Sequence, residues 1–173
     1  IGLMFAAARK IGIADRTMKE GKWEKKALMG VEIYGKTLGV VGIGNIGIIV
    51  AEKAVALGMR VLAYDIFVSK EFAASKGIEL VDLDTLLKES DFITVHVPLV
   101  KETRGLIDKN AIAKMKKSAI IINVARGPVV NEKDLNEALR EGRIAGAALD
   151  VFDEEPPPKD HPLVLCDNVV CTP

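Results

Sequence analysis

Short apolar runs alternate with longer amphipathic segments along most of the chain. The alternation predicts strands at 38–41, 60–64, 78–81, 92–97, 119–124, 144–151 and 168–172, and helices at 48–57, 71–76, 83–90, 108–115 and 131–141. The run at 119–124 is apolar at nearly every position, which is typical of a strand buried on both faces of a parallel sheet. Strands that alternate with helices predict an α/β fold, a doubly wound parallel sheet with helices on both faces and ligands at its carboxyl edge.

The first 35 residues precede this pattern and are expected to form a helix and an arm. Apolar residues recur at helical spacing over 1–19, which predicts one helix that ends at Gly21. The arm, 22–35, carries Trp23 among several other apolar residues but fits no strand. Apolar side chains gathered on such a segment mark an association surface, so we expect a homodimer or higher homo-oligomer through helix and arm. The alternative is an arm that folds back onto its own domain.

The apolar run at 38–41 leads into a G-x-G-x-x-G motif formed by Gly42, Gly44 and Gly47, and a helix-length segment follows. In a dinucleotide-binding Rossmann unit the first glycine allows the tight turn and the second lets a pyrophosphate approach the backbone. The third lets helix and strand pack closely. The helix that begins here offers free N–H groups and a positive dipole end to the phosphates.

Asp65 ends the second strand, where a Rossmann unit places the acid that binds the ribose hydroxyls. This context favours a dinucleotide site over a chance glycine motif, although Asp65 could simply cap a loop. The carboxylate would repel the 2′-phosphate of NADP, and the residues at 66–68 include no arginine to receive it. The sequence therefore predicts NAD as the cofactor.

Composition narrows the class of protein further. The chain has 173 residues, 49% of them hydrophobic, which suits one domain with a sizeable core. Lys plus Arg and Asp plus Glu number 24 each, so no basic excess points to nucleic acid or a membrane surface. Two cysteines and two histidines form no zinc pattern, so we expect no metal. The single cysteine pair could form a disulfide, but we expect reduced thiols and a cytoplasmic location. Because the chain starts at Ile1 within an apolar segment, we interpret it as part of a longer protein.

Several strands end in polar, Pro or Gly residues that the predicted topology brings to one edge. The chain continues with 96–99 after the fourth strand, 123–127 after the fifth, and Asp150 and then Glu155 after the sixth. Such convergence defines a site better than a single residue does. Arg126 could still be an ordinary loop arginine, Asp150 a helix cap and Glu155 a solvated loop acid. The two histidines, at 96 and 161, are each more simply structural or exposed than catalytic.

The pieces GIGNIG, HVPL, ETRGLID, NVARGPVVNEKDL and LDVFDEEPP together resemble the D-2-hydroxyacid dehydrogenase family, over nearly the whole chain. The resemblance implies two domains, with a nucleotide-binding domain inserted into a substrate domain built from both chain ends. We expect 1–173 to be the nucleotide-binding domain alone. Several stretches, among them AALDVFDEEPPPKDHPL and NVVCTP, are similar to the branch that oxidises 3-phosphoglycerate to 3-phosphohydroxypyruvate in serine biosynthesis.

The resemblance also implies roles for individual residues. Arg126 would hold the substrate carboxylate, and Glu155 would pair with a histidine acid–base that belongs just beyond Pro173. The implied cofactor contacts are the amides of Asn45 and Ile46 at the pyrophosphate, Asp65 at the ribose, Val97 and Pro98 beside the cofactor, and Val124, Ala125, Arg126 and Asp150 toward the nicotinamide. Asn45, Val100 and Asn131 depart from the residues most frequent in the family, which affects loop details rather than the fold.

Three functions follow from the resemblance. The first is oxidation of 3-phosphoglycerate by the whole protein, with this chain inactive on its own. A glyoxylate/hydroxypyruvate or D-lactate-type reductase is the second, because the residues that would choose the substrate lie outside the chain. The third is a non-catalytic NAD(H)-sensing scaffold. Retention of both Arg126 and Glu155 favours catalysis.

Overall fold

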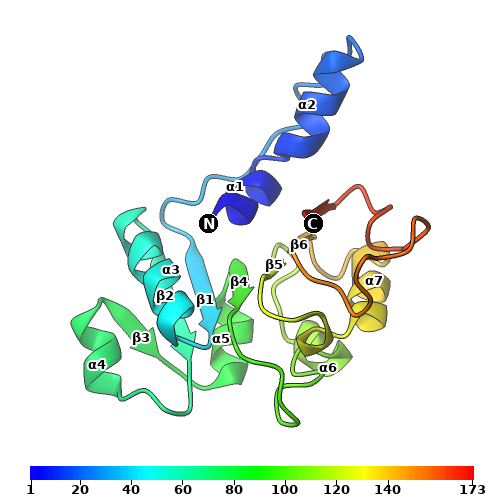
Figure 1. The fold of residues 1–173 in the computed structure, drawn as a ribbon. Helices are drawn as coiled ribbons and strands as arrows, with labels where there is room; N and C mark the ends of the chain where they lie inside the picture. The colour runs from blue at the N-terminus through cyan, green and yellow to red at the C-terminus, as the bar shows by residue number, and fades with distance from the viewer.

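Seven parallel strands form one sheet in the computed structural model, which describes all 173 residues (Figure 1). The strand order is β3-β2-β1-β4-β5-β6-β7. The strands are β1 (Thr37–Val41), β2 (Arg60–Tyr64), β3 (Ile78–Leu80), β4 (Phe92–Val95), β5 (Ile120–Asn123), β6 (Gly146–Leu149) and β7 (Val169–Cys171). The predicted doubly wound sheet is therefore confirmed, and the order of the strands reverses between β1 and β4.

Helices cover both faces of the sheet. One face carries α1 (Gly2–Ala8), α3 (Asn45–Ala56) and α4 (Lys70–Ser75), and the other carries α5 (Leu83–Glu89), α6 (Lys109–Ala113) and α7 (Glu132–Arg140). Successive strand residues alternate between the two cores: Val40 packs with the first set and Val41 with the second. In β5, Ile120 and Ile122 face one core and Ile121 the other, as the continuous apolar run predicts.

The prediction of one helix over 1–19 is wrong. The chain forms α1 and then α2 (Ile11–Lys19), separated by Lys10, which adopts a left-handed conformation with φ of 53°. The break has a packing reason, because Met4 and Ala8 of α1 are buried against the sheet, whereas α2 projects away from it (Figure 1). The arm returns along this projection without entering the sheet, as predicted, and Val31 N donates to Ala8 O at 2.8 Å.

Local capping sets the ends of the other helices. Asp108 accepts hydrogen bonds from Asn110 N and Ala111 N, and Asn131 accepts one from Asp134 N, so each residue caps the helix that follows it. The helix after Asp108 is shorter than predicted, and α3 starts three residues earlier, at Asn45, directly after the glycine turn.

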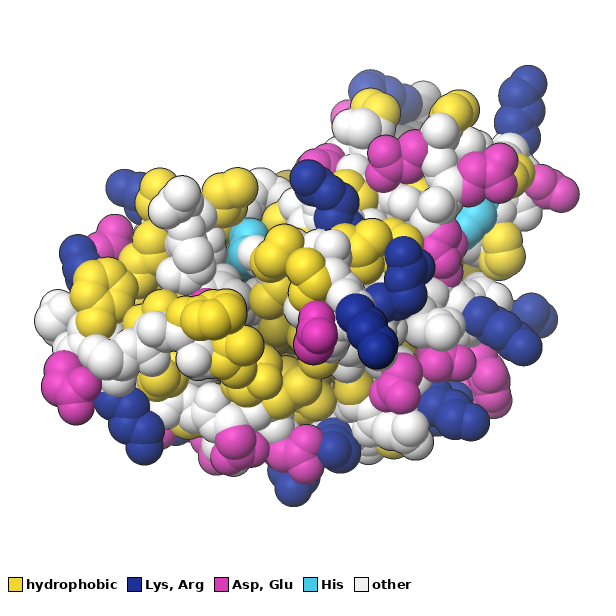
Figure 2. Space-filling model, turned by 60° about the horizontal axis from the view of Figure 1, so that its bottom comes forward, with side chains coloured by type: hydrophobic (Ala, Val, Ile, Leu, Met, Phe, Trp, Pro, Cys, Tyr) yellow, Lys and Arg dark blue, Asp and Glu magenta, His cyan; other side chains and the backbone are white.

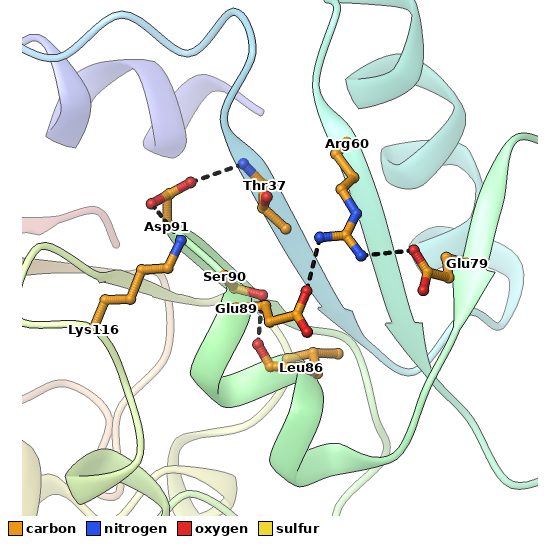
Figure 3. Close-up of polar contacts among 8 residues, drawn as sticks. All are labelled: Thr37, Arg60, Glu79, Leu86, Glu89, Ser90, Asp91 and Lys116. Atoms are coloured by element: carbon orange, nitrogen blue, oxygen red, sulfur yellow. Dashed lines mark hydrogen bonds and ion pairs between the residues drawn. The ribbon is translucent and has the colours of Figure 1, made fainter.

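Two polar networks hold the amino-terminal edge of the sheet (Figure 3). Asp91 accepts hydrogen bonds from Thr37 N and Lys116 Nζ, both at 2.9 Å, which join the starts of β1 and β4 to the segment before β5. Arg60 at the start of β2 donates to Glu79 at 2.8 Å and to Glu89 at 2.7 Å. Burial opposes ionisation of Asp91, but the two donors outweigh it and lower the pKa of the carboxyl group.

Asp91→Asn should reduce the free energy of unfolding at pH 7 by about 1–3 kcal/mol, because a charged acceptor is lost at a site where the side chain is only 20% exposed. A carboxyl group with a lowered native pKa stabilises the fold above its ordinary pKa, and this contribution is lost as the pH falls through the native value. The difference in the free energy of unfolding between wild type and Asp91→Asn, measured by urea unfolding, should therefore become smaller at acidic pH.

The matched control is Asp84→Asn, which removes an exposed ion pair with Lys114 and should cost less than about 1 kcal/mol. If both variants lost the same free energy of unfolding, the stabilising role of Asp91 would be contradicted.

Candidate functional site

The glycine turn between β1 and α3 leaves no space for a side chain at Gly42 or at Gly47. Gly42 has φ of 90°, and its N–H donates to Tyr64 O at 2.9 Å. A Cβ on Gly42 would lie 2.8 Å from Val97 Cγ1, and one on Gly47 would lie 2.0 Å from Gly42 O. The closeness of Val97 to Gly42 shows that the segment after β4 packs against the turn. The closeness of Gly47 to the Gly42 carbonyl shows that α3 packs against β1, as the third glycine of the motif predicts.

Gly44 and the start of α3 form an open cradle. A Cβ on Gly44 would meet nothing within 4 Å, and no side chain caps the helix. The first N–H groups of a helix have no intrahelical partner, so those of Asn45 and Ile46 are available to an anion. This arrangement fits a dinucleotide pyrophosphate.

Asp65 links the end of β2 to the glycine turn. Its Oδ2 accepts from Ile43 N at 2.9 Å and its Oδ1 accepts from Phe67 N at 2.8 Å. It therefore organises loops, as the alternative interpretation allows, and it also borders a cavity of about 500 Å³. The lining residues are Tyr64, Asp65, Lys70, Leu80, Val81, Asp82 and Thr85. Lys70 is a cation at this cavity that the sequence reasoning missed, because it lies outside the short segment after β2.

The segment after β4 runs beside the glycine turn. His96 N donates to Val41 O at 2.8 Å, and the partly buried Val97 and the exposed Pro98 follow. His96 Nε2 lies 2.9 Å from Thr94 Oγ1, and burial lowers the pKa of His96 to about 4. The imidazole is thus neutral near pH 7, in keeping with the structural interpretation of this residue.

The loop after β5 is held by Asn123, which is almost fully buried. Its Nδ2 donates to Arg126 O at 3.0 Å, and its Oδ1 accepts from Ala125 N at 3.1 Å. This bonding fixes the backbone from Val124 to Arg126, while the Arg126 side chain is exposed and donates to Ala125 O at 2.6 Å. This role of Asn123 was not predicted. A polar residue at the end of an otherwise apolar, buried strand could have indicated it.

The loop after β6 packs directly on this turn. A Cβ on Gly127 would lie 2.1 Å from the backbone of Phe152, so the two loops meet backbone to backbone. Glu155 is exposed, and its Oε1 accepts from Phe152 N at 3.0 Å. Asp150, at the end of β6, accepts from the Thr172 hydroxyl.

The structure brings the predicted residues to one edge of the sheet. The β1 and β2 arrows in Figure 1 point to the lower end of the molecule, and Figure 2 turns that end forward. Hydrophobic side chains spread across the left half of this face, and Lys and Arg side chains gather right of centre (Figure 2). In the strand order, the glycine turn and Asp65 follow β1 and β2 on one half of this edge, and Arg126 and Glu155 follow β5 and β6 on the other half.

Comparison with known proteins assigns the family. Such a turn at the reversal of a doubly wound sheet defines a dinucleotide-binding Rossmann fold. Residues 1–173 match the model described as "D-isomer specific 2-hydroxyacid dehydrogenase, NAD binding domain". The chain belongs to this family, and NAD is the cofactor of the domain that the family model describes.

Individual relatives carry different enzyme names. The chain is 58% identical to D-3-phosphoglycerate dehydrogenase of Archaeoglobus fulgidus, covering 100% of this chain and 33% of that protein. It is 51% identical to hydroxypyruvate reductase of Thermotoga maritima, covering 100% and 56%. The structure of D-lactate dehydrogenase with NAD⁺ from Lactobacillus jensenii matches with a TM-score of 0.88 at 38% identity, covering 99% and 56%. The chain thus spans about a third to just over half of these relatives.

Two further features of the chain concern membranes and metals. None of its helices combines the length and the apolar character needed to cross a membrane. No group of three or more His, Cys, Asp or Glu side chains is placed to hold a metal ion.

Gly47→Ala and Gly44→Ala should separate folding from binding. The methyl group on Gly47 would collide with the Gly42 carbonyl, so Gly47→Ala should lower the free energy of unfolding by about 1–3 kcal/mol or more. Gly44→Ala faces open space and should stay within about 0.5 kcal/mol of wild type. It should nevertheless weaken NADH binding by roughly tenfold, about 1.4 kcal/mol, because its methyl group occupies the cradle. Urea unfolding and titration calorimetry measure the two effects, and unchanged NADH affinity in Gly44→Ala would contradict the cradle.

Proposed function

We propose that the protein containing this chain is an NAD-dependent dehydrogenase that oxidises 3-phosphoglycerate to 3-phosphohydroxypyruvate, the entry to serine biosynthesis in the cytoplasm. The observation that carries the proposal is the packing of the Arg126 loop on the Glu155 loop through Gly127 and Phe152, at the same edge of the sheet as the glycine turn. The names of the A. fulgidus relative and of a second, 55% identical relative from Methanocaldococcus jannaschii support the choice of substrate.

The proposed cofactor contacts follow the carboxyl edge. The N–H groups of Asn45 and Ile46 bind the pyrophosphate, and Asp65 accepts hydrogen bonds from the adenosine ribose. The backbone of Val97 and Pro98 flanks the cofactor. Val124, Ala125 and Asp150 approach the nicotinamide end, which accepts a hydride from the C2 carbon of the substrate when NAD is bound.

Arg126 and Glu155 are the proposed reaction residues of this chain. The exposed guanidinium of Arg126 offers a carboxylate two parallel N–H donors. Glu155 keeps one oxygen on Phe152 N and orients a histidine that lies outside this chain, raising the pKa of the imidazole. In this proposal 1–173 is the nucleotide-binding domain, and the substrate domain comes from the remainder of the protein.

Steady-state turnover by the full-length protein tests the function. Oxidation of 3-phosphoglycerate with NAD⁺ should exceed that of glycolate, D-glycerate and D-lactate in kcat/KM. A preference for glyoxylate or hydroxypyruvate in the reducing direction would instead support the reductase that the T. maritima relative represents. NADH binding without turnover of any 2-hydroxy acid would support the sensing scaffold. Without the substrate domain and the external histidine, the isolated chain should reduce 3-phosphohydroxypyruvate no faster than a buffer blank.

Asp65 should give NADH preference over NADPH. Its carboxylate repels a 2′-phosphate at the ribose, while Lys70 at the same cavity partly offsets this repulsion. In titration calorimetry, Asp65→Ala should therefore lower the ratio of the dissociation constant for NADPH to that for NADH, and Lys70→Ala should raise this ratio. Tighter binding of NADPH than NADH to the wild-type chain would overturn the role of Asp65.

Arg126→Lys in the full-length protein should lower kcat/KM by roughly 100-fold, about 2.7 kcal/mol, mainly through a raised KM for the hydroxy acid. A single ammonium group cannot reproduce the paired donors of the guanidinium. The KM for NAD⁺ should change little, since the glycine turn is untouched. Arg104→Lys, an exposed arginine of the loop after β4, is the control, and equal effects of the two changes would remove Arg126 from the substrate site.

A homodimer through α2 and the arm is the proposed assembly. Ile33 is buried, but Trp23, Met29 and Tyr34 are 77%, 76% and 74% exposed, and Ile11 and Met18 of α2 are also exposed. Only part of the arm therefore packs on its own domain, and apolar side chains of α2 and the arm remain exposed. A two-fold interface would use this same patch on both subunits.

Light scattering should show a dimer at micromolar protein, and Trp23→Ala should raise its dissociation constant at least roughly 30-fold, about 2 kcal/mol, as truncation of a central interface tryptophan does. Phe67→Ala removes another exposed aromatic residue, but one far along the chain beside Asp65, and should leave the mass unchanged. A concentration-independent monomer would refute the dimer.

A further inference from the structure

One glutamate at the start of α7 bonds to both ends of the loop that carries Glu155. Glu132 Oε1 accepts a hydrogen bond from Asp153 N at 2.8 Å, and Glu132 Oε2 lies 3.1 Å from His161 Nε2. Glu132 is the first residue of α7, where the helix dipole favours a negative charge. The 153–161 loop is therefore fastened to a helix at its beginning and its end.

The Glu132–His161 pair is largely removed from water. The two side chains are 17% and 14% exposed, and the His161 ring meets the Phe152 ring edge-on with centroids 5.5 Å apart. The charged groups around the pair are Asp153, whose carboxyl pKa is raised by burial and by Glu132, and Arg104, which opposes that rise. A hydrogen bond in such surroundings positions its partners more firmly than one in water.

The loop between these two attachments holds Glu155. Phe152 N, adjacent to Asp153, donates to Glu155 Oε1 at 3.0 Å, so the residue before the first attachment directly orients the carboxylate. His161 fixes Phe152 from the other side through the ring contact. Neither Glu132 nor His161 forms a side-chain hydrogen bond with Arg126 or with the glycine turn.

We propose that Glu132 and His161 are positioning residues: together they hold the Phe152–Glu155 segment so that the Glu155 carboxylate stays within reach of the acid–base histidine. The inference rests on the proposed dehydrogenase function, since it concerns the residue that would orient that histidine. A loop released at either attachment would let the carboxylate move away, and the pKa of the external imidazole would fall.

The test compares variants of the full-length protein in steady-state reduction of 3-phosphohydroxypyruvate across pH. His161→Phe retains an aromatic ring against Phe152 but removes the bond to Glu132. It should lower kcat roughly 2- to 10-fold and move the limb of the pH profile that reports the acid–base histidine to lower pH. Glu155→Gln, which removes the carboxylate itself, should move that limb in the same direction. The KM for NADH should stay unchanged. Glu132→Gln, whose side-chain oxygen can still accept a hydrogen bond from Asp153 N, should reduce kcat less than Glu132→Ala does.

Lys133→Ala, an exposed neighbour on α7 with no bond to the loop, should leave the profile unmoved. A lower kcat with an unshifted pH limb in both His161→Phe and Glu132→Ala would mean that the pair only stabilises the fold, and would overturn the proposal.

A second readout separates this proposal from the function on which it rests. If the wild-type protein turned over no 2-hydroxy acid, the proposed function would fail, and amide hydrogen exchange would still report on the loop. Exchange at Phe152 and Asp153 should be roughly 2- to 10-fold faster in His161→Phe than in wild type. Unchanged exchange would contradict the attachment of the loop even in an active enzyme.

Discussion

The carboxyl edge depends on one contact that only glycine permits. The Gly42 carbonyl lies so close to Gly47 that any Cβ there would come within 2.0 Å of it, and this proximity sets α3 directly on the end of β1. The neighbouring strand ends are then placed around the turn. Asp65 bonds to Ile43 N from the β2 side, and Val97 packs on Gly42 from the β4 side. A cradle for an anion results from backbone geometry, with no cationic side chain required.

A second glycine contact arranges the other half of the edge. Gly127 meets the backbone of Phe152, so the loops after β5 and β6 share one surface, and Asn123 fixes the first of them from within the sheet. Arg126 and Glu155 therefore project from loops whose backbones are held by buried contacts, while their own side chains stay exposed. Rigid supports beneath exposed polar groups suit a site that must admit and release small molecules.

Structure was predicted well where it depends on residues that are close together in the sequence. The apolar run of β5, the glycine spacing and the helix that begins after Asn131 each depend on neighbouring residues, and each corresponds to the element expected. Family resemblance added the expected roles of Arg126 and Glu155, which no local pattern contains.

Features that depend on tertiary contacts could not be predicted. Lys10 breaks the first helix because α1 packs on the sheet and α2 does not, and nothing in the helical spacing of apolar residues distinguishes the two parts. Glu132 and His161 are 29 residues apart and meet only once α7 and the last loop are folded. Lys70 reaches the Asp65 cavity from the start of α4, beyond residues 66–68 that directly follow Asp65.

The central claim is that a dinucleotide binds over the glycine turn and Asp65, and amide chemical-shift mapping with NADH tests it most directly. The largest shifts should fall on the amides of Gly44 to Gly47, which face the pyrophosphate, and on Ile43 and Phe67, whose N–H groups bond to Asp65. Smaller shifts should extend to Val97 and Ala125. Shifts confined to α7 or to the arm, with the glycine turn unmoved, would contradict the account.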